Sequence, residues 1–191
     1  MSRINDLETK VQTLYAQKNP NRADWADWLW KGHVLSVARY ASEFSGRFDA
    51  DAELSRAAAL THDIADAKMK RDDPEHGNVS LEIGRSLMRE CGFSSRDIAI
   101  VIDDAVRYHS CRGNKQPKST VGKVLATADA VAHFKTDFYE FAKKAFRMPE
   151  QEMKKWVLEK IDRDLYKKVF FDEIKKELKP DYDRIKAKFA G

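Results

Sequence analysis

The sequence predicts an all-α protein, and three observations support that fold class. Apolar residues recur at steps of three and four along almost the whole chain, which is the period of an amphipathic helix. No segment alternates strictly between apolar and polar residues, as a half-buried strand would. The 191 residues combine 42% hydrophobic with 35% charged side chains, a composition typical of soluble globular proteins.

The first half of the chain divides into three predicted helices. The first covers about residues 4–14 and ends at KNPNRAD, where a proline and two asparagines interrupt the pattern. The second begins near Asp24, whose carboxylate suits an N-cap, and runs to the Ser45-Gly46 break. The third covers about residues 51–64 and leads into the polar connection KMKRDDPE.

Three more helices are predicted before the tail of the chain. Two lie near residues 77–91 and 95–109, with Cys91-Gly92 between them. The loop SCRGNKQPKS is the clearest interruption in the sequence. After it, Thr120–Phe134 is apolar and rich in small residues, so we expect a buried helix there.

The tail carries the whole charge surplus of the chain. Residues 137–190 alternate aromatic and charged positions, as surface helices do, and we expect Pro149 and Pro180 to divide them. The formal net charge of +4 arises in the last third, because residues 135–191 hold sixteen basic and twelve acidic side chains. Since the signs alternate along helical faces, we interpret these charges as a solvated surface and expect no nucleic-acid partner.

Targeting signals and structural cysteines are not evident. No apolar stretch reaches the ~18–20 residues that a membrane span needs, and the N-terminus lacks the continuous apolar run of a secretory signal. We therefore expect no membrane partner and a cytoplasmic location. Cys91 and Cys111 have no metal-knuckle spacing, which argues against a disulfide framework and a cysteine-bound zinc.

Several imidazoles and carboxylates fall on helix faces that otherwise bury apolar residues. His33 lies on the apolar stripe of the second predicted helix, and His109 lies at the end of the apolar stripe of the fifth predicted helix. Asp129 sits inside the predicted buried helix, where an ionised carboxylate needs a cation or a metal ion beside it. Taken singly, each histidine could be a core residue whose hydrogen bonds are satisfied, and Asp129 could form a salt bridge. Together with His62 and Asp63, they are the kind of donors from which helical bundles build metal sites.

These residues resemble the signature of the HD-domain superfamily of metal-dependent phosphohydrolases, which is a histidine, a His-Asp pair and a distant aspartate. The similar stretches are GHVLSVARYA with His33, AALTHDIAD with His62 and Asp63, and KVLATADAV with Asp129. The likeness covers about residues 25–134. It implies a divalent metal site formed by these four side chains.

The resemblance also implies a domain organisation. We expect an N-terminal helix over residues 1–20, an HD-domain helical bundle over residues 21–136, and a charged helical extension over residues 137–191 that packs on the domain. The sequence assigns no role to this extension.

Two further histidines extend the implied ligand set. Some members of the superfamily carry histidines that help to hold a second metal ion, and PEHGNVSLEIG with His76 and VRYHSCRG with His109 resemble those positions. His76 could instead be an exposed residue at a helix start. If both bind, Asp63 could bridge two ions. Imidazole and carboxylate donors without a thiolate suit Mn, Fe, Co, Ni, Zn or Mg, so we expect one or two such ions. His133 matches no position of the motif and is interpreted as structural.

Asp63 and Asp66 are the predicted catalytic carboxylates. Asp66 follows Asp63 by three residues and lies near the same helix face, so it could steer an attacking water or protonate a leaving oxygen. A loop-capping role is the alternative. An acidic residue here resembles the HD nucleotidases, and the glycine-tyrosine-proline signature of the cyclic-dinucleotide phosphodiesterases is absent.

The expected function is hydrolysis of a phosphoester or phosphoanhydride in a small, nucleotide-like substrate by a metal-activated water. Arg112, Lys115 and Lys118 follow His109 in a loop and are candidates for binding the substrate phosphate, with solvated loop charge as the alternative. Two other functions stay open: a non-catalytic metal-binding or nucleotide-binding regulatory module, and a di-iron oxygenase of the HD type.

Overall fold

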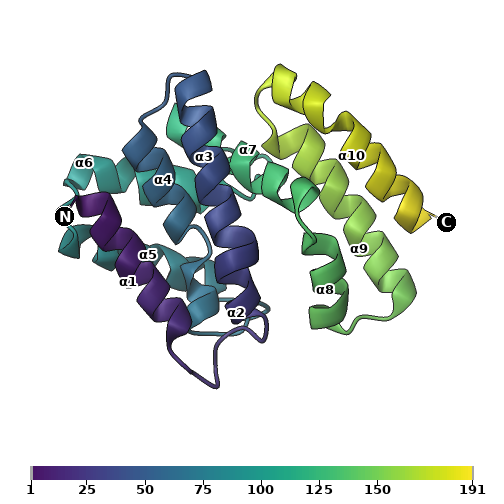
Figure 1. The fold of residues 1–191 in the computed structure, drawn as a ribbon, viewed down its shortest axis with the longest axis horizontal. Coiled ribbons are helices and arrows are strands. Elements are labelled where there is room, and N and C mark those ends of the chain that lie inside the picture. The colour runs from purple at the N-terminus through teal and green to yellow at the C-terminus, as the bar shows by residue number, and fades with distance from the viewer. Residues whose placement is uncertain (1, 191) are drawn as a thin grey trace.

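Every regular element in the described part of the chain, residues 2–190 of the computed structural model, is helical, which confirms the predicted all-α class. The α-helices are α1 (Arg3–Ala16), α2 (Ala26–Trp28), α3 (Leu35–Arg47), α4 (Ala52–Thr61), α5 (His76–Glu90), α6 (Ser95–Ile98), α7 (Thr120–Lys135), α8 (Phe138–Phe146), α9 (Glu150–Arg163) and α10 (Asp172–Ala190). The 3₁₀ segment is η2 (Ile64–Ala67), and the π-helical segments are η1 (Leu29–Val34), η3 (Ala99–Val106) and η4 (Asp164–Lys168). Helices α1–α6 gather on one side, α8–α10 lie on the other, and α7 runs between them (Figure 1).

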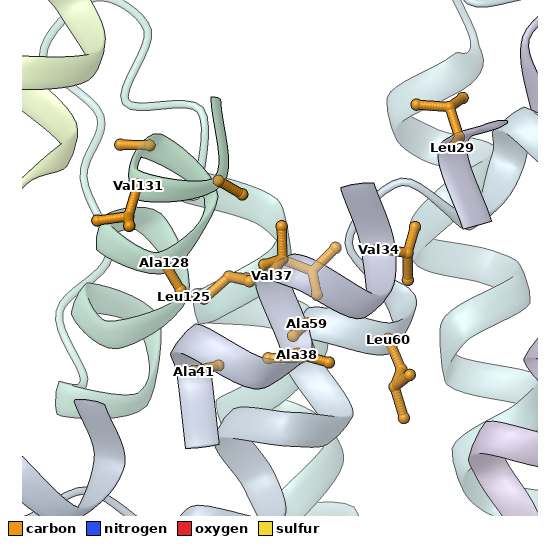
Figure 2. Packing of buried hydrophobic residues seen from close by; sticks show 14 of the residues in the cluster. Leu29, Val34, Val37, Ala38, Ala41, Ala59, Leu60, Leu125, Ala128 and Val131 are labelled. Carbon is orange, nitrogen blue, oxygen red and sulfur yellow. The ribbon is translucent and has the colours of Figure 1, made fainter. Parts of the chain in front are cut away.

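Helices α3, α4 and α7 form the centre of the core. Val37 and Ala41 of α3, Ala59 of α4, and Leu125 and Ala128 of α7 are all completely buried and belong to one apolar cluster (Figure 2). Small side chains at these contacts allow the helices to approach closely. Each Å² of apolar surface that they bury contributes about 25 cal/mol to stability. The close packing therefore fixes the distances between side chains that these helices carry near the core.

The buried helix expected at Thr120–Phe134 is present as α7. Every side chain from Val124 to Phe134 is buried, and Ser119 caps the helix by accepting a hydrogen bond from the backbone N–H of Gly122. Any polar side chain within this buried stretch must therefore find its partner inside the protein.

Three details of the first half differ from the prediction. Asp24 is not an N-cap: α2 begins at Ala26 without a side-chain cap, and Asp24 pairs with Lys70 instead. The helix expected to end at Ser45-Gly46 is built from α2, η1 and α3 and runs slightly further. The third predicted helix ends early, because α4 stops at Thr61 and the chain tightens into η2. The His-Asp pair consequently lies in the turn between α4 and η2.

The tail is divided by one of the two prolines. Pro149 separates α8 from α9 as predicted, whereas Pro180 lies inside α10 and does not end it. The second division falls instead at residues 169–171, between η4 and α10. An interior proline disfavours a helix by about 3 kcal/mol. Here the apolar stripe continues across it, since Leu178 and Tyr182 are both buried, and this packing offsets the loss.

The N-terminal helix α1 packs on α4, and two ion pairs join their surfaces. Arg3 contacts Glu53 at 2.7 Å, and Arg56 contacts Glu8 at 2.7 Å. The domain boundaries expected after residues 20 and 136 stay predictions. Within the described residues, no helix has the length and apolar character needed to cross a bilayer.

Candidate metal centre

Donor side chains from three helical elements converge at one point. His33 comes from η1, His62 follows the last residue of α4, and Asp129 lies in α7. The Nε2 atoms of His33 and His62 are 3.3 Å apart, and Asp129 Oδ1 lies 3.1 Å from the first and 3.9 Å from the second. Ligand atoms about 2.0–2.2 Å from one metal ion are separated from each other by roughly such distances. The three atoms are therefore placed as one coordination sphere requires.

The burial and chemistry of these donors fit a divalent metal ion. All three side chains are buried, and neither His33 Nδ1 nor Asp129 Oδ1 has a hydrogen-bond partner among residues 2–190. A buried carboxylate oxygen without a hydrogen bond is unfavourable, and a cation between it and the imidazoles would compensate it. Nitrogen and oxygen donors without a thiolate suit Mn, Fe, Co, Ni, Zn or Mg.

Two histidines are held in the tautomer that metal binding needs. His62 Nδ1 lies 2.8 Å from the carbonyl oxygen of Ala59, and His109 Nδ1 lies 2.7 Å from that of Val106. Because a carbonyl only accepts, each Nδ1 must donate its proton. The lone pair of each ring is consequently on Nε2, the atom that faces the centre, and its orientation is fixed by the helix end behind it.

Burial keeps the imidazoles of His33 and His109 neutral, and neighbouring charge keeps the carboxylate of Asp129 ionised. Burial lowers the pKa of His33, and it lowers the pKa of His109 to about 4. Burial opposes ionisation of Asp129, but the neighbouring His133 and Lys168 outweigh it and hold the pKa of this carboxyl well below its usual range. These are the protonation states in which the side chains can act as ligands.

Arg71 joins the two predicted catalytic carboxylates. Its Nη2 lies 2.7 Å from Asp63 Oδ2, and its Nη1 lies 2.6 Å from Asp66 Oδ2. Burial would raise the pKa of Asp63, but the charge of Arg71 keeps it well below its usual range. Asp66 is completely buried and its second oxygen lies 3.0 Å from His76 Nε2. This placement suits a residue that positions Arg71 and His76 better than one that touches a substrate.

A cavity of about 600 Å³ opens onto the centre. Asp63, Asp129, His76 and His109 lie in its wall, whereas Asp66 does not. His109 Nε2 is 3.9 Å from Asp63 Oδ1, and its ring centroid is 5.3 Å from that of His62, so this histidine stands at the edge of the three-donor group. The ring of His76 is turned toward Asp66. Of the two additional predicted ligands, His109 thus lies beside one of the three donors, whereas His76 contacts Asp66.

Charged side chains of the C-terminal extension are buried against the centre. Lys168 forms an ion pair with Asp129, and Lys160 contacts Asp164 at 3.0 Å. Asp164 is completely buried, and the two lysines are only 7% and 3% exposed. Burial lowers the pKa of Lys160 to about 8. The interpretation of the tail as a solvated surface is therefore wrong for this stripe, because its residues pack inward on α7 instead of facing water.

His133 connects the extension with the metal ligands. Its Nδ1 donates to Asp164 Oδ2 at 3.0 Å, and its Nε2 lies 3.3 Å from Asp129 Oδ1. The spacing of charged residues in the sequence is a signal for this cluster. Lys160, Asp164 and Lys168 follow one another at steps of four, which places them on one helical face.

The candidate phosphate-binding residues are separated by the structure. Arg112 lies in the wall of the cavity, Lys115 lines a smaller hollow beside it, and Lys118 lines neither. Arg163, at the end of α9, is a cavity cation that the sequence did not indicate.

In this helical bundle, separate helical elements supply histidine and aspartate donors to one buried centre. This arrangement defines a class of metal-binding α-proteins. The model of the HD domain family matches residues 31–133, and the chain belongs to this family. The whole fold is similar to the crystal structure of a predicted HD superfamily hydrolase from an uncultured Thermotogales bacterium. The two chains are 20% identical with a TM-score of 0.64, over 99% of this chain and 90% of the other. The predicted HD-type bundle is thereby confirmed.

Proposed function

We propose that this protein is a metal-dependent phosphohydrolase that cleaves a phosphoester or phosphoanhydride in a small, nucleotide-like substrate. The observation that carries the proposal is the convergence of His33, His62 and Asp129 beside a cavity whose wall holds Asp129 and several cations. A divalent ion at such a site lowers the pKa of its bound water toward about 7 and polarises a phosphoryl oxygen. Membership of the HD family and the hydrolase name of the structural neighbour agree with this chemistry.

The protein's own side chains would orient the reactants. Asp63 has one oxygen held by Arg71, which leaves Oδ1 directed toward His109 and the cavity. We assign Asp63 to the metal centre and to the orientation of the attacking water. Asp66 acts through Arg71, because it does not reach the cavity.

The test combines metal analysis of the purified protein with a screen for phosphate release. Nucleotides, dinucleoside polyphosphates and aryl phosphates are offered with each of several divalent metals. The double variant His62→Ala, Asp63→Ala should lose both metal and activity. Asp72→Asn is the matched control, since Asp72 lines the cavity but forms no ion pair within the described residues, and it should keep both.

Other outcomes point to the alternatives. If the native protein binds metal and releases no phosphate from any substrate, the phosphohydrolase assignment is wrong. Tight nucleotide binding without turnover would then indicate a regulatory module. Bound iron with redox-dependent absorption would indicate an oxygenase.

A further inference from the structure

Two arginines stand where the cavity of the metal centre opens outward. Arg112 comes from the loop after η3, and Arg163 ends α9 in the C-terminal extension. Both line the cavity of about 600 Å³. Both also line a neighbouring groove of about 670 Å³ between that loop and helices α9 and α10. The two guanidinium groups therefore mark the passage between the cavity and the groove.

Among the described residues, these arginines differ from the other cations of the cavity, because neither has an acidic partner. Arg71 is paired with Asp63, Lys160 with Asp164, and Lys168 with Asp129.

Across residues 2–190, by contrast, neither Arg112 nor Arg163 has a carboxylate within ion-pair distance. The Nε of Arg163 is in addition buried without a hydrogen-bond partner. A buried donor without a partner is unfavourable, and an anion bound at the passage would satisfy it.

The guanidinium group matches a phosphate, because its parallel N–H donors bind two oxygens at once. A phosphoryl group at the metal centre would be neutralised by the metal ion that His33, His62 and Asp129 would hold. We propose that Arg112 and Arg163 form a second phosphate site, so that the substrate carries at least two linked phosphates, one at the metal centre and the next between the two arginines. This inference rests on the proposed function and narrows it to a phosphoanhydride.

The hydrolysis that follows is balanced without a further reactant. The oxygen of water forms a bond to the phosphorus at the metal centre, and the bond from that phosphorus to the bridging oxygen breaks. The bridging oxygen keeps the electron pair and leaves on the phosphate held by Arg112 and Arg163, whose charges stabilise it. The proton of the water passes to solvent. Because Arg163 lies outside residues 31–133, the site depends on the extension as well as on the HD domain.

Binding of unreactive probes tests the second site directly. Methylenediphosphonate, whose bridging carbon resists hydrolysis, and methylphosphonate are titrated into the metal-loaded full-length protein by calorimetry. The native protein should bind the diphosphonate about tenfold or more tighter, as one additional charge-assisted contact predicts. In Arg163→Gln and in Arg112→Gln this preference should disappear. Lys167→Gln is the matched control, because Lys167 is exposed and lines only the groove, and it should keep the preference.

The inference is overturned if the native protein does not prefer the diphosphonate or if the variants keep the preference. It is also overturned if the substitutions lower the affinities for both probes by the same factor. Metal content is measured before and after each titration, so that loss of metal to the probe is recognised. Arg112 lies in an exposed loop, so its variant decides the question even if Arg163→Gln does not fold.

Turnover measurements distinguish failure of this inference from failure of the proposed function. If the native enzyme hydrolyses neither tripolyphosphate, nor p-nitrophenyl phosphate, nor any other phosphate compound of the screen, the proposed function fails while the binding comparison still decides the second site. If it hydrolyses both, Arg163→Gln should lower kcat/KM for tripolyphosphate about tenfold more than for the monoester. An equal loss for both substrates would show that Arg163 has only a structural role.

Discussion

The imidazole ring of His133 lies flat against that of His33, with ring centroids 4.9 Å apart and planes inclined by 6°. On its other side, His133 is held by the buried carboxylate of Asp164. The Nδ1 of His33 has no hydrogen-bond partner within the described structure. The orientation of this candidate ligand therefore depends on the stack, and the stack depends on the extension that carries Asp164.

Removal of the stacked ring should weaken metal binding. His133→Ala frees the ring of His33 to turn, and changes of residues that orient ligands typically lower metal affinity 10–100-fold. His133→Phe keeps a flat ring in place and should retain most of the affinity. Competition with a chromophoric chelator measures both variants. Equal affinities for the two variants would show that the stack does not orient His33.

Neutralisation of Asp164 should destabilise the fold. This carboxylate is completely buried and contacts His133, Tyr139 and Lys160. Asp164→Asn leaves buried lysine charge uncompensated, so the free energy of unfolding should fall by about 3 kcal/mol. Urea denaturation of the metal-free protein measures the change. Glu159→Gln, an exposed change five residues earlier in α9, serves as the control and should alter stability little.

The metal-free protein should lose stability as pH falls below neutrality. Burial lowers the pKa of His109 to about 4 and that of His133 to about 3, whereas imidazoles of an unfolded chain titrate near about 6.5. Between these values the unfolded chain binds protons that the folded chain does not, so lower pH favours unfolding. Stability is thus fully present above about pH 6.5 and decreases toward about pH 3. The depressed pKa of Asp129 adds to the loss in acid.

Urea midpoints in the presence of a chelator, from pH 7 to pH 4, measure this dependence. His133→Gln removes one of the two titrating groups and should make the decrease shallower. A midpoint that does not change over this range would contradict the assigned protonation states.

Metal removal should lower the melting temperature. A ligand at 100 times its Kd stabilises the folded state by about 2.7 kcal/mol, which corresponds to a Tm shift of roughly 5–10 °C for a chain of this size. Differential scanning fluorimetry with each divalent metal, and with a chelator, measures the shift. His62→Ala should abolish it because it removes one of the three converging donors. A variant that still shows the full shift would place the metal elsewhere.

Local sequence patterns by themselves predicted much of the fold of this protein. The three-and-four spacing of apolar residues predicted helices throughout, and the small apolar side chains of Thr120–Phe134 predicted a buried helix, because periodicity and burial are encoded within a few turns. The stretch THDIAD and the isolated Asp129 also revealed their chemistry, since a carboxylate on an apolar helix face needs a cation.

Only the tertiary structure decided which distant residues meet at the centre. The sequence placed Asp66 beside Asp63, but the structure turns it inward to Arg71 and away from the cavity. The alternating charges of the tail predicted a solvated surface, yet Lys168 forms an ion pair with Asp129, thirty-nine positions away. The spacing of charges along one helix shows that they share a face, but what that face packs against is set by how the helices dock. Docking is stabilised by contacts between residues that are distant in the sequence, and no local pattern shows which of these residues meet.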